Sequence, residues 1–329
     1  MDVTTRSIID ADQIQYPSTQ LNRVLVIGLG QLGLPVAKYI KKRGGFDVYG
    51  YDISSKAMDR AQTTAGIKKA TNFSDFDVYI LCISTHKPED MFSPQIEGLL
   101  SIIDKISKEA KNGALVSIES TIPKGTSKKV FEMLNHKLHV AHAPHRWYAL
   151  EEQEHGVNQV RVIGGVCDCC LKIAMYFYDG RSENMNNSSS SSSSFSNEEK
   201  SKAKSLGIPM HPVSDIEIAE LAKIIENADR YLQIAFAEDL YIYCQANNIS
   251  FPELRDAVNT KWNVHILEPR EGIGGHCLPK DTKMFLQSSK SIKSKILQAA
   301  IEVDQDYRRY RKSRGIHSLI APSSTPSVR

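Results

Sequence analysis

Short apolar runs alternate with longer segments of mixed polarity through the first two thirds of the chain. These runs predict strands at residues 23–27, 47–51, 78–83, 114–118, 138–141, 160–163 and 208–213. The first amphipathic stretch between them, residues 32–43, ends at a glycine pair, which is a signal for the end of a helix. Strands that alternate with helices favour a mostly parallel sheet with helices on both faces.

The pattern changes after Ser214. Apolar residues recur at steps of three and four from Ile218 onward, and neither Gly nor Pro interrupts residues 215–250. This spacing predicts one long helix, or two in close succession, with an extensive apolar surface. Further helices are expected at residues 253–258 and at about 292–311.

A glycine fingerprint lies directly after the first predicted strand. Gly28, Gly30 and Gly33 form G-x-G-x-x-G at the start of a helix, which is the context of a dinucleotide-binding turn. The glycines allow a tight turn around Leu29, a close approach of the backbone to a pyrophosphate, and close packing of the helix on the sheet. Asp52 ends the second predicted strand, where a carboxylate binds a ribose hydroxyl and repels a 2′-phosphate, so we expect NAD. Lys56 could also contact the adenosine ribose, although a solvated side chain explains it equally simply.

We therefore predict an α/β fold, a Rossmann-type doubly wound parallel sheet, followed by an all-α central domain built on a long helix. The NAD-binding domain should span residues 22–213 and the helical domain residues 214–312. Residues 1–21 are expected to form an N-terminal extension and residues 313–329 a flexible tail. Seven consecutive serines lie within a polar segment at about 181–204, which we expect to be a disordered insertion.

Composition excludes several classes. The chain has 329 residues, and 41 basic against 38 acidic residues leave a net charge of +3, too small to suggest a nucleic-acid or membrane surface. No apolar stretch is long enough for a transmembrane helix, and the polar N-terminus lacks a signal-peptide core, so we expect a cytoplasmic protein. Cys167, Cys169 and Cys170 are close together, but no histidine has ligand spacing to them. We expect a helix start there and no metal site.

Two polar groups stand out in the helical part. Lys223 and Asn227 are four residues apart, so they share a helix face and could both donate hydrogen bonds to one oxyanion. The alternative is a solvated lysine beside a surface asparagine. Cys277 follows Gly274, Gly275 and His276, a loop whose glycines could bring the backbone close to a substrate.

Pro279 suits the first turn of a helix, which would place Cys277 at a helix N-terminus, where a thiolate is stabilised. Asp281 shares the face of Cys277 and could orient water or accept a proton. A nucleophilic cysteine beside NAD can hold an aldehyde as a thiohemiacetal for a second hydride transfer. The alternative for Cys277 is a buried cysteine in a tight turn.

The chain resembles the UDP-sugar dehydrogenase family, which includes the UDP-glucose and UDP-N-acetylmannosamine 6-dehydrogenases. The resemblance rests on the segments GLGQLGLP, ESTIPKGT, RVIGG, AELAKIIENA and GIGGHCLPKD, in order, over about residues 22–312. It implies oxidation of a sugar C6 hydroxymethyl to a carboxylate with two NAD reduced per turnover. It also implies a homodimer formed through the helical domain.

The resemblance implies a role for each matching residue. Cys277 matches the nucleophile that forms a thiohemiacetal and then a thioester, and Lys223 and Asn227 match the oxyanion stabilisers. Asp281 and Thr121 match the pair that positions water, and Thr85 matches the threonine near the nicotinamide.

Two departures leave questions open. Where the family has glutamate after a proline, this chain has His145, which could act as an acid or base with a pKa near neutrality. Glu151 or Glu152 could serve instead, or the chemistry could differ. Family members also have a C-terminal UDP-binding domain, and the residues after Arg311 are too few to form one. A separate chain could supply it, the substrate could be smaller, or the protein could be a weakly active relative.

The leading hypothesis is an NAD-dependent nucleotide-sugar 6-dehydrogenase. The GGHC motif favours a UDP-N-acetylhexosamine, whereas Pro279-Lys280-Asp281 favours UDP-glucose, so the sugar stays open. One alternative is a β-hydroxyacid dehydrogenase, which has no need for Cys277. Another is a truncated, non-catalytic NAD-binding or regulatory relative.

Overall fold

A computed structural model describes residues 21–87, 89–90, 93–146, 156–179, 205–288 and 294–315. The N-terminal extension, the serine-rich insertion, Glu151, Glu152 and most of the tail lie outside the described residues. The chain divides into two compact units. The first contains the residues up to Lys87 and from Gln95 to Lys223, and the second contains those from Ile224 on, with a short segment before Gln95.

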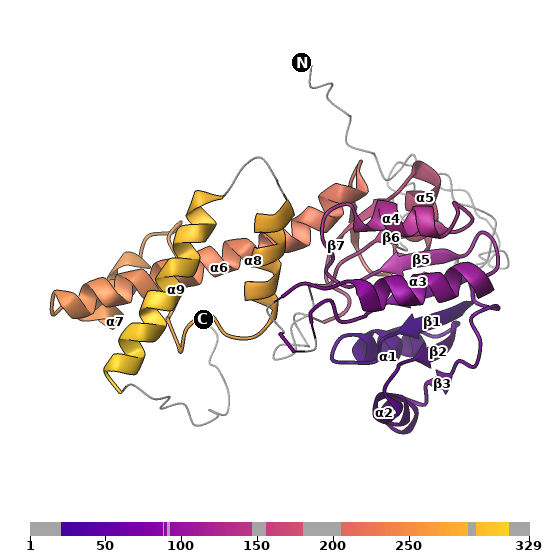
Figure 1. The fold of residues 1–329 in the computed structure, drawn as a ribbon, viewed down its shortest axis with the longest axis horizontal. Helices are drawn as coiled ribbons and strands as arrows, with labels where there is room; N and C mark the ends of the chain where they lie inside the picture. Colours follow the sequence, from indigo (N-terminus) through magenta and orange to yellow (C-terminus); the bar gives the residue numbers. More distant parts are fainter. Residues whose placement is uncertain are drawn as a thin grey trace, which may run out of the picture. The chain divides into compact units, whose positions relative to one another are not determined.

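The first unit is built on one sheet of eight strands in the order β3-β2-β1-β4-β5-β6-β7-β8 (Figure 1). All neighbouring strands are parallel except β6 and β7, which are antiparallel. This confirms the predicted doubly wound sheet and adds one reversed strand pair. The strands are β1 (Arg23–Ile27), β2 (Asp47–Tyr51), β3 (Lys68–Lys69), β4 (Val78–Leu81), β5 (Leu115–Ile118), β6 (His139–His142), β7 (Arg161–Gly165) and β8 (Met210–Pro212).

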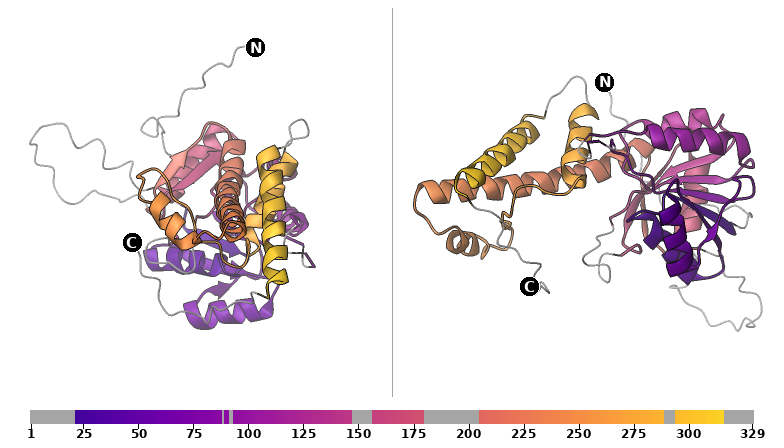
Figure 2. Two further views of the ribbon diagram at one scale, coloured as in Figure 1. Left: turned by 90° about the vertical axis from the view of Figure 1, so that its left-hand side faces the viewer. Right: turned by 60° about the horizontal axis from the view of Figure 1, so that its bottom comes forward.

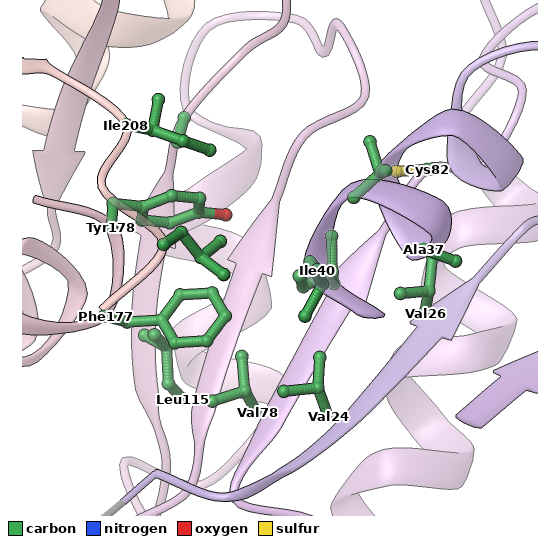
Figure 3. Packing of buried hydrophobic residues seen from close by; sticks show 14 of the residues in the cluster. Val24, Val26, Ala37, Ile40, Val78, Cys82, Leu115, Phe177, Tyr178 and Ile208 are labelled. Carbon is green, nitrogen blue, oxygen red and sulfur yellow. The ribbon is translucent and has the colours of Figure 1, made fainter. Parts of the chain in front are cut away.

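Alternation along the central strands divides the core between the two faces of the sheet. In β1, Val24 and Val26 point to one face, while Leu25 and Ile27 point to the other. The first face is covered by α1 (Gly33–Arg43) and α5 (Asp168–Tyr178), whose apolar residues pack on it (Figure 3). The second face is covered by α3 (Glu97–Glu109) and α4 (Thr126–Met133).

Local signals explain where the helices near the first strands end. α1 ends at Gly44, whose φ of +80° is readily adopted only by glycine, as the glycine pair predicted. α2 (Ser55–Ala65) begins where the Ser54 side chain accepts a hydrogen bond from the Ala57 backbone, and it ends at Gly66 in the left-handed region.

The second unit is helical. The apolar stretch after Ser214 forms a single helix, α6 (Ile216–Ala246), which begins in the first unit and continues into the second. α8 (Cys277–Ser288) and α9 (Lys295–Ser313) lie beside α6 (Figures 1 and 2), and α7 (Phe251–Val258) follows its end. Among the described residues, no helix combines the length and apolarity needed to cross a membrane.

Candidate active site

The glycine turn connects β1 to α1 at the carboxyl edge of the sheet. A Cβ on Gly28 would lie 2.4 Å from the Cys82 carbonyl oxygen, and a Cβ on Gly33 would lie 1.7 Å from the Gly28 carbonyl oxygen. These two positions therefore exclude any side chain. No atom lies within 4 Å of a Cβ built on Gly30, so the backbone there is open to a pyrophosphate.

Asp52 joins the end of β2 to the glycine turn. Its Oδ2 accepts a hydrogen bond from the Leu29 backbone at 2.6 Å, and its Oδ1 accepts one from Ser54 at 2.8 Å. Each carboxylate oxygen keeps a further lone pair for a ribose hydroxyl. Lys56 is exposed, as a solvated lysine would be. Arg60, which was not predicted from the sequence, donates to the Leu29 carbonyl at 2.9 Å and adds positive charge beside the turn.

Thr85 and Thr121 come together at the same edge. Thr85 is buried, and its hydroxyl donates to the Thr121 carbonyl at 2.7 Å. Ser120 also donates to the Ile83 carbonyl at 2.7 Å. These bonds hold the segments that follow β4 and β5 against each other, so the structure places two predicted site residues side by side.

A buried charge network lies below this edge. Glu119 follows β5 and is 1% exposed, and its carboxylate accepts hydrogen bonds from Tyr178 and His145. The guanidinium of Arg161, also 1% exposed, lies 3.1 Å from Glu119 Oε1. No role was predicted from the sequence for Glu119, Arg161 or Tyr178. The sequence did contain a signal for them. Glu119 directly follows the apolar strand β5 and Arg161 begins the apolar strand β7. Because buried charges require partners, two opposite charges in such positions indicate a pair.

This network corrects the expectation for His145. Burial, and next to it the positive charge of Arg161, lower the pKa of His145 to about 4 against the opposing effect of Glu119. Burial raises the pKa of Glu119, but the charges of His145 and Arg161 and its hydrogen bonds outweigh burial and lower it to about 2. At neutral pH we therefore expect a neutral imidazole beside a carboxylate, not a group that titrates near neutrality.

α6 brings Lys223 to the first unit. One turn earlier, Glu220 accepts hydrogen bonds from the backbone of Gly125 at 2.6 Å and of Ser127 at 2.7 Å, so it caps the N-terminus of α4. The positive charge of Lys223 contributes to the lowered pKa of His145. Glu220 thereby holds the start of α6 on the sheet unit and positions Lys223 there.

The second unit contains the other predicted polar groups. Cys277 is exposed and is the first residue of α8, which confirms the expected helix start. Asp281 lies one turn later and is 1% exposed. The Asn227 side chain on α6 donates to Asp281, and Lys280 Nζ lies 2.6 Å from the other carboxylate oxygen. The structure thus connects Asn227 with Asp281 and adds Lys280, which the sequence analysis did not single out.

The loop before Cys277 is anchored to α9. The Ile273 backbone donates to Asp304 at 2.8 Å and its carbonyl accepts from Arg308 at 2.8 Å, while Arg308 and Asp304 are themselves paired. Gly274 and Gly275 have no atom within 4 Å of a built Cβ. His276 follows them directly before the helix. The loop therefore combines a fixed base with an open backbone.

The fold and the site together define a class of protein. It is a dinucleotide-binding protein with two units: a doubly wound sheet that carries a dinucleotide turn, and a helical unit that carries polar side chains. The chain belongs to the UDP-glucose/GDP-mannose dehydrogenase family: the NAD binding domain of that family matches residues 59–180 and its central domain matches residues 217–306. The match to an NAD binding domain confirms the prediction of NAD as the cofactor.

Named relatives agree with this assignment. The chain is 26% identical over 312 residues to a UDP-N-acetyl-D-mannosamine dehydrogenase of Methanococcus maripaludis, covering 88% of this chain and 66% of that protein. The structure of a UDP-D-ManNAc dehydrogenase from Pyrococcus horikoshii matches with a TM-score of 0.69 at 25% identity, over 88% of this chain and 70% of that one. The chain thus spans about two thirds of the length of these relatives.

A second solved structure shares the fold alone. It is a 3-hydroxyisobutyrate dehydrogenase of Mycobacterium tuberculosis, which matches with a TM-score of 0.60 at 13% identity. The match covers 89% of this chain and 94% of that one.

Proposed function

We propose that the protein is an NAD-dependent nucleotide-sugar 6-dehydrogenase that oxidises the C6 hydroxymethyl of a UDP-sugar to a carboxylate. The observation that carries the proposal is the exposed thiol of Cys277 at a helix N-terminus, one turn before the buried Asp281, which Asn227 holds. Oxidation of an alcohol to a ketone needs no nucleophile, whereas oxidation to the acid needs a group that retains the aldehyde.

The first half of the reaction uses the oxyanion-binding pair. The sugar alcohol is oxidised to an aldehyde, and NAD, when bound, accepts the hydride at each of the two oxidations. Lys223 and Asn227 donate hydrogen bonds to the C6 oxygen as negative charge develops on it. The Cys277 thiolate then adds to the aldehyde carbon to form a thiohemiacetal, and its oxidation leaves a thioester on Cys277.

Hydrolysis of the thioester completes the reaction. Asp281 and Thr121 position a water molecule, and Asp281 accepts its proton as the water attacks the acyl carbon. The carbon–sulfur bond breaks and the Cys277 thiolate is restored. In sum, one alcohol, one water and two NAD+ give one carboxylate, two NADH and three protons. The Glu119 carboxylate holds the neutral imidazole of His145, so we assign His145 a positioning role.

Two observations support a proposal for the identity of the sugar. The GGHC motif and the substrates named for the M. maripaludis and P. horikoshii relatives favour UDP-N-acetylmannosamine. Pro279-Lys280-Asp281 keeps UDP-glucose as the competing substrate.

NADH formation is measured with UDP-N-acetylmannosamine, UDP-N-acetylglucosamine and UDP-glucose. The proposal expects two NADH for each sugar consumed, and loss of at least about a thousandfold in rate for Cys277→Ala. Cys244→Ala, which removes a thiol far along α6, is the matched control and should keep the rate. No turnover of any nucleotide sugar, or a Cys277→Ala variant that keeps activity on a β-hydroxyacid, contradicts the proposal and favours the alternative dehydrogenase.

We also propose a homodimer formed through α6. Ile225, Phe236 and Tyr243 are between 46% and 58% exposed along this helix, and large apolar side chains are rarely left in water in such a row. A separate chain that completes the nucleotide-sugar pocket stays a second partner prediction. To test for such a partner, turnover of the nucleotide sugar by the purified full chain is measured with and without extract of its native host. A partner chain in the extract should raise the turnover.

A further inference from the structure

Three cysteine thiols meet at the start of α5, far along the chain from Cys277. Cys167 occupies the N-cap position of the helix, and Cys169 and Cys170 lie in its first turn. The Sγ atom of Cys167 lies 2.8 Å from that of Cys169 and 3.1 Å from that of Cys170. Cys167 and Cys169 are exposed and Cys170 is buried, so the cluster is open on one side.

A histidine from another element completes the cluster. His139 begins β6, and a ring nitrogen of His139 and the sulfur atoms of Cys169 and Cys170 all lie within 4.8 Å of one another. β6 packs against α5, and the Val140 backbone donates to Cys170 Sγ at 3.4 Å. No metal was predicted here because no histidine lies near the cysteines along the chain, whereas His139 reaches them only in the fold.

The distances suit a small tetrahedral ion. Zinc binds cysteine sulfur at about 2.3 Å and histidine nitrogen at about 2.0 Å, which places ligand atoms roughly 3.6 to 3.8 Å apart. The sulfur separations of 2.8 and 3.1 Å are shorter than this value, and the His139 nitrogen lies within 4.8 Å of the sulfur atoms of Cys169 and Cys170. Cys167 lies outside the group formed by His139, Cys169 and Cys170, so its exposed side chain must turn toward His139 to become the fourth ligand.

The charges are also favourable. A neutral imidazole is the form of histidine that binds a metal ion. Three thiolates around a divalent cation leave one negative charge at the N-terminus of an eleven-residue helix, where the helix dipole stabilises it.

We propose that Cys167, Cys169, Cys170 and His139 bind one Zn²⁺ ion in a structural site that joins β6 to the start of α5. A Cys₃His set is a common donor set of structural zinc. The ion replaces the thiol protons, satisfies the buried Cys170 and cross-links a strand to the helix that covers it. The site is independent of the proposed dehydrogenase activity.

Zinc content of the purified full chain tests the site. We expect one zinc per chain after dialysis, measured by atomic spectroscopy, and intense visible bands of tetrahedral cobalt after exchange with Co²⁺. Cys169→Ser and His139→Gln change partly exposed side chains, so both variants should fold and lose zinc to a chelator that leaves the wild type loaded. Cys277→Ser removes an exposed thiol from the other unit and should keep one zinc.

A competing outcome is a disulfide between Cys167 and Cys170. Maleimide labelling of the denatured chain without reductant, after zinc removal, should count all six cysteines as free thiols if the site holds metal. Four labelled thiols overturn the proposal. A wild-type chain that takes up no zinc under reducing conditions, or zinc that survives in both Cys169→Ser and His139→Gln, also overturns it.

Discussion

Glu119 is a charged side chain in the interior of the sheet unit. Its carboxylate is paired with Arg161 and accepts hydrogen bonds from Tyr178 and His145, and both charged partners are 1% exposed. Breaking a buried pair is costly because the remaining charge has no water around it. The pKa of Glu119, lowered to about 2, means that this stabilisation is present above pH 4.5 and is lost as the pH falls toward 2.

Replacing Arg161 tests this network. Arg161→Met should lower the free energy of unfolding by about 3 kcal/mol or more at pH 7, since it leaves the Glu119 charge buried without its permanent partner. Denaturant unfolding gives the value. Arg309→Met, at an exposed site, is the control and should change stability by less than about 0.5 kcal/mol. A change equally small for Arg161→Met means that the pair does not stabilise the fold.

Substitutions at two glycines of the cofactor turn should have different effects, one on stability and the other on cofactor binding. Gly33→Ala forces a Cβ onto the Gly28 carbonyl, so the variant should unfold at a clearly lower temperature. Gly30→Ala meets no protein atom and should keep the wild-type melting temperature, yet its methyl group occupies the space of the pyrophosphate and should weaken NADH binding by about tenfold or more. Thermal melting and NADH fluorescence titration separate the two effects, and tight NADH binding by Gly30→Ala contradicts the assigned turn.

α6 contributes residues to the candidate active site, to the core of the helical unit and to an exposed apolar surface. Its start is held by Glu220 at the N-terminus of α4, and Lys223 and Asn227 follow on one face. Farther along, Tyr231 and Ala235 pack on α9 and the Cys277 loop. One continuous helix therefore bears both a buried face and the exposed row of Ile225, Phe236 and Tyr243.

The exposed row predicts a change of oligomeric state. Phe236→Asp places a charge in the proposed dimer contact and should shift the protein from dimer to monomer at micromolar concentration, as measured by light scattering. Gln245→Asp adds the same charge at an exposed polar position of the same helix and should leave the dimer intact. A wild-type chain that is already monomeric refutes the homodimer.

The stability of the whole chain depends on cores of unequal size. The sheet unit has extensive apolar clusters on both faces, whereas the helical unit has two smaller ones. The helical unit also buries Glu238 completely, and neither carboxylate oxygen has a hydrogen-bond partner among the described residues. Burial, and next to it the charge of Asp304, raise the pKa of Glu238 to about 8 against the opposing effect of Arg308.

This residue predicts how stability changes with pH. Below pH 4.5, Glu238 is protonated in both the folded and the unfolded chain, so its ionisation does not lower the free energy of unfolding. Between pH 4.5 and 8 the unfolded chain ionises while the folded chain does not, so stability falls as the pH rises. Glu238→Gln should remove this loss, by on the order of 3 kcal/mol at pH 8 and little at pH 4.5. Melting curves across this range test it, with the exposed Glu302→Gln as control, and equal gains at both pH values exclude the mechanism.

Sequence patterns predicted those features that depend on neighbouring residues. The alternation of β1, the glycine turn, the end of α1 at Gly44 and the start of α8 at Cys277 each follow from spacing within one segment. β3 was not predicted because Lys68–Lys69 has no apolar residue, and it is a strand only because it pairs with β2. The reversed pairing of β6 and β7 likewise leaves no local signal.

The sequence by itself determined the class of fold, the cofactor turn and the chemical character of the cysteine loop, because backbone geometry and periodicity act over a few residues. Only the tertiary structure decided which distant side chains meet. It paired Glu119 with Arg161 and His145, joined Asn227 to Asp281, and brought His139 to the cysteines of α5. Such contacts depend on how strands and helices pack across the chain, and packing is a property of the folded molecule as a whole.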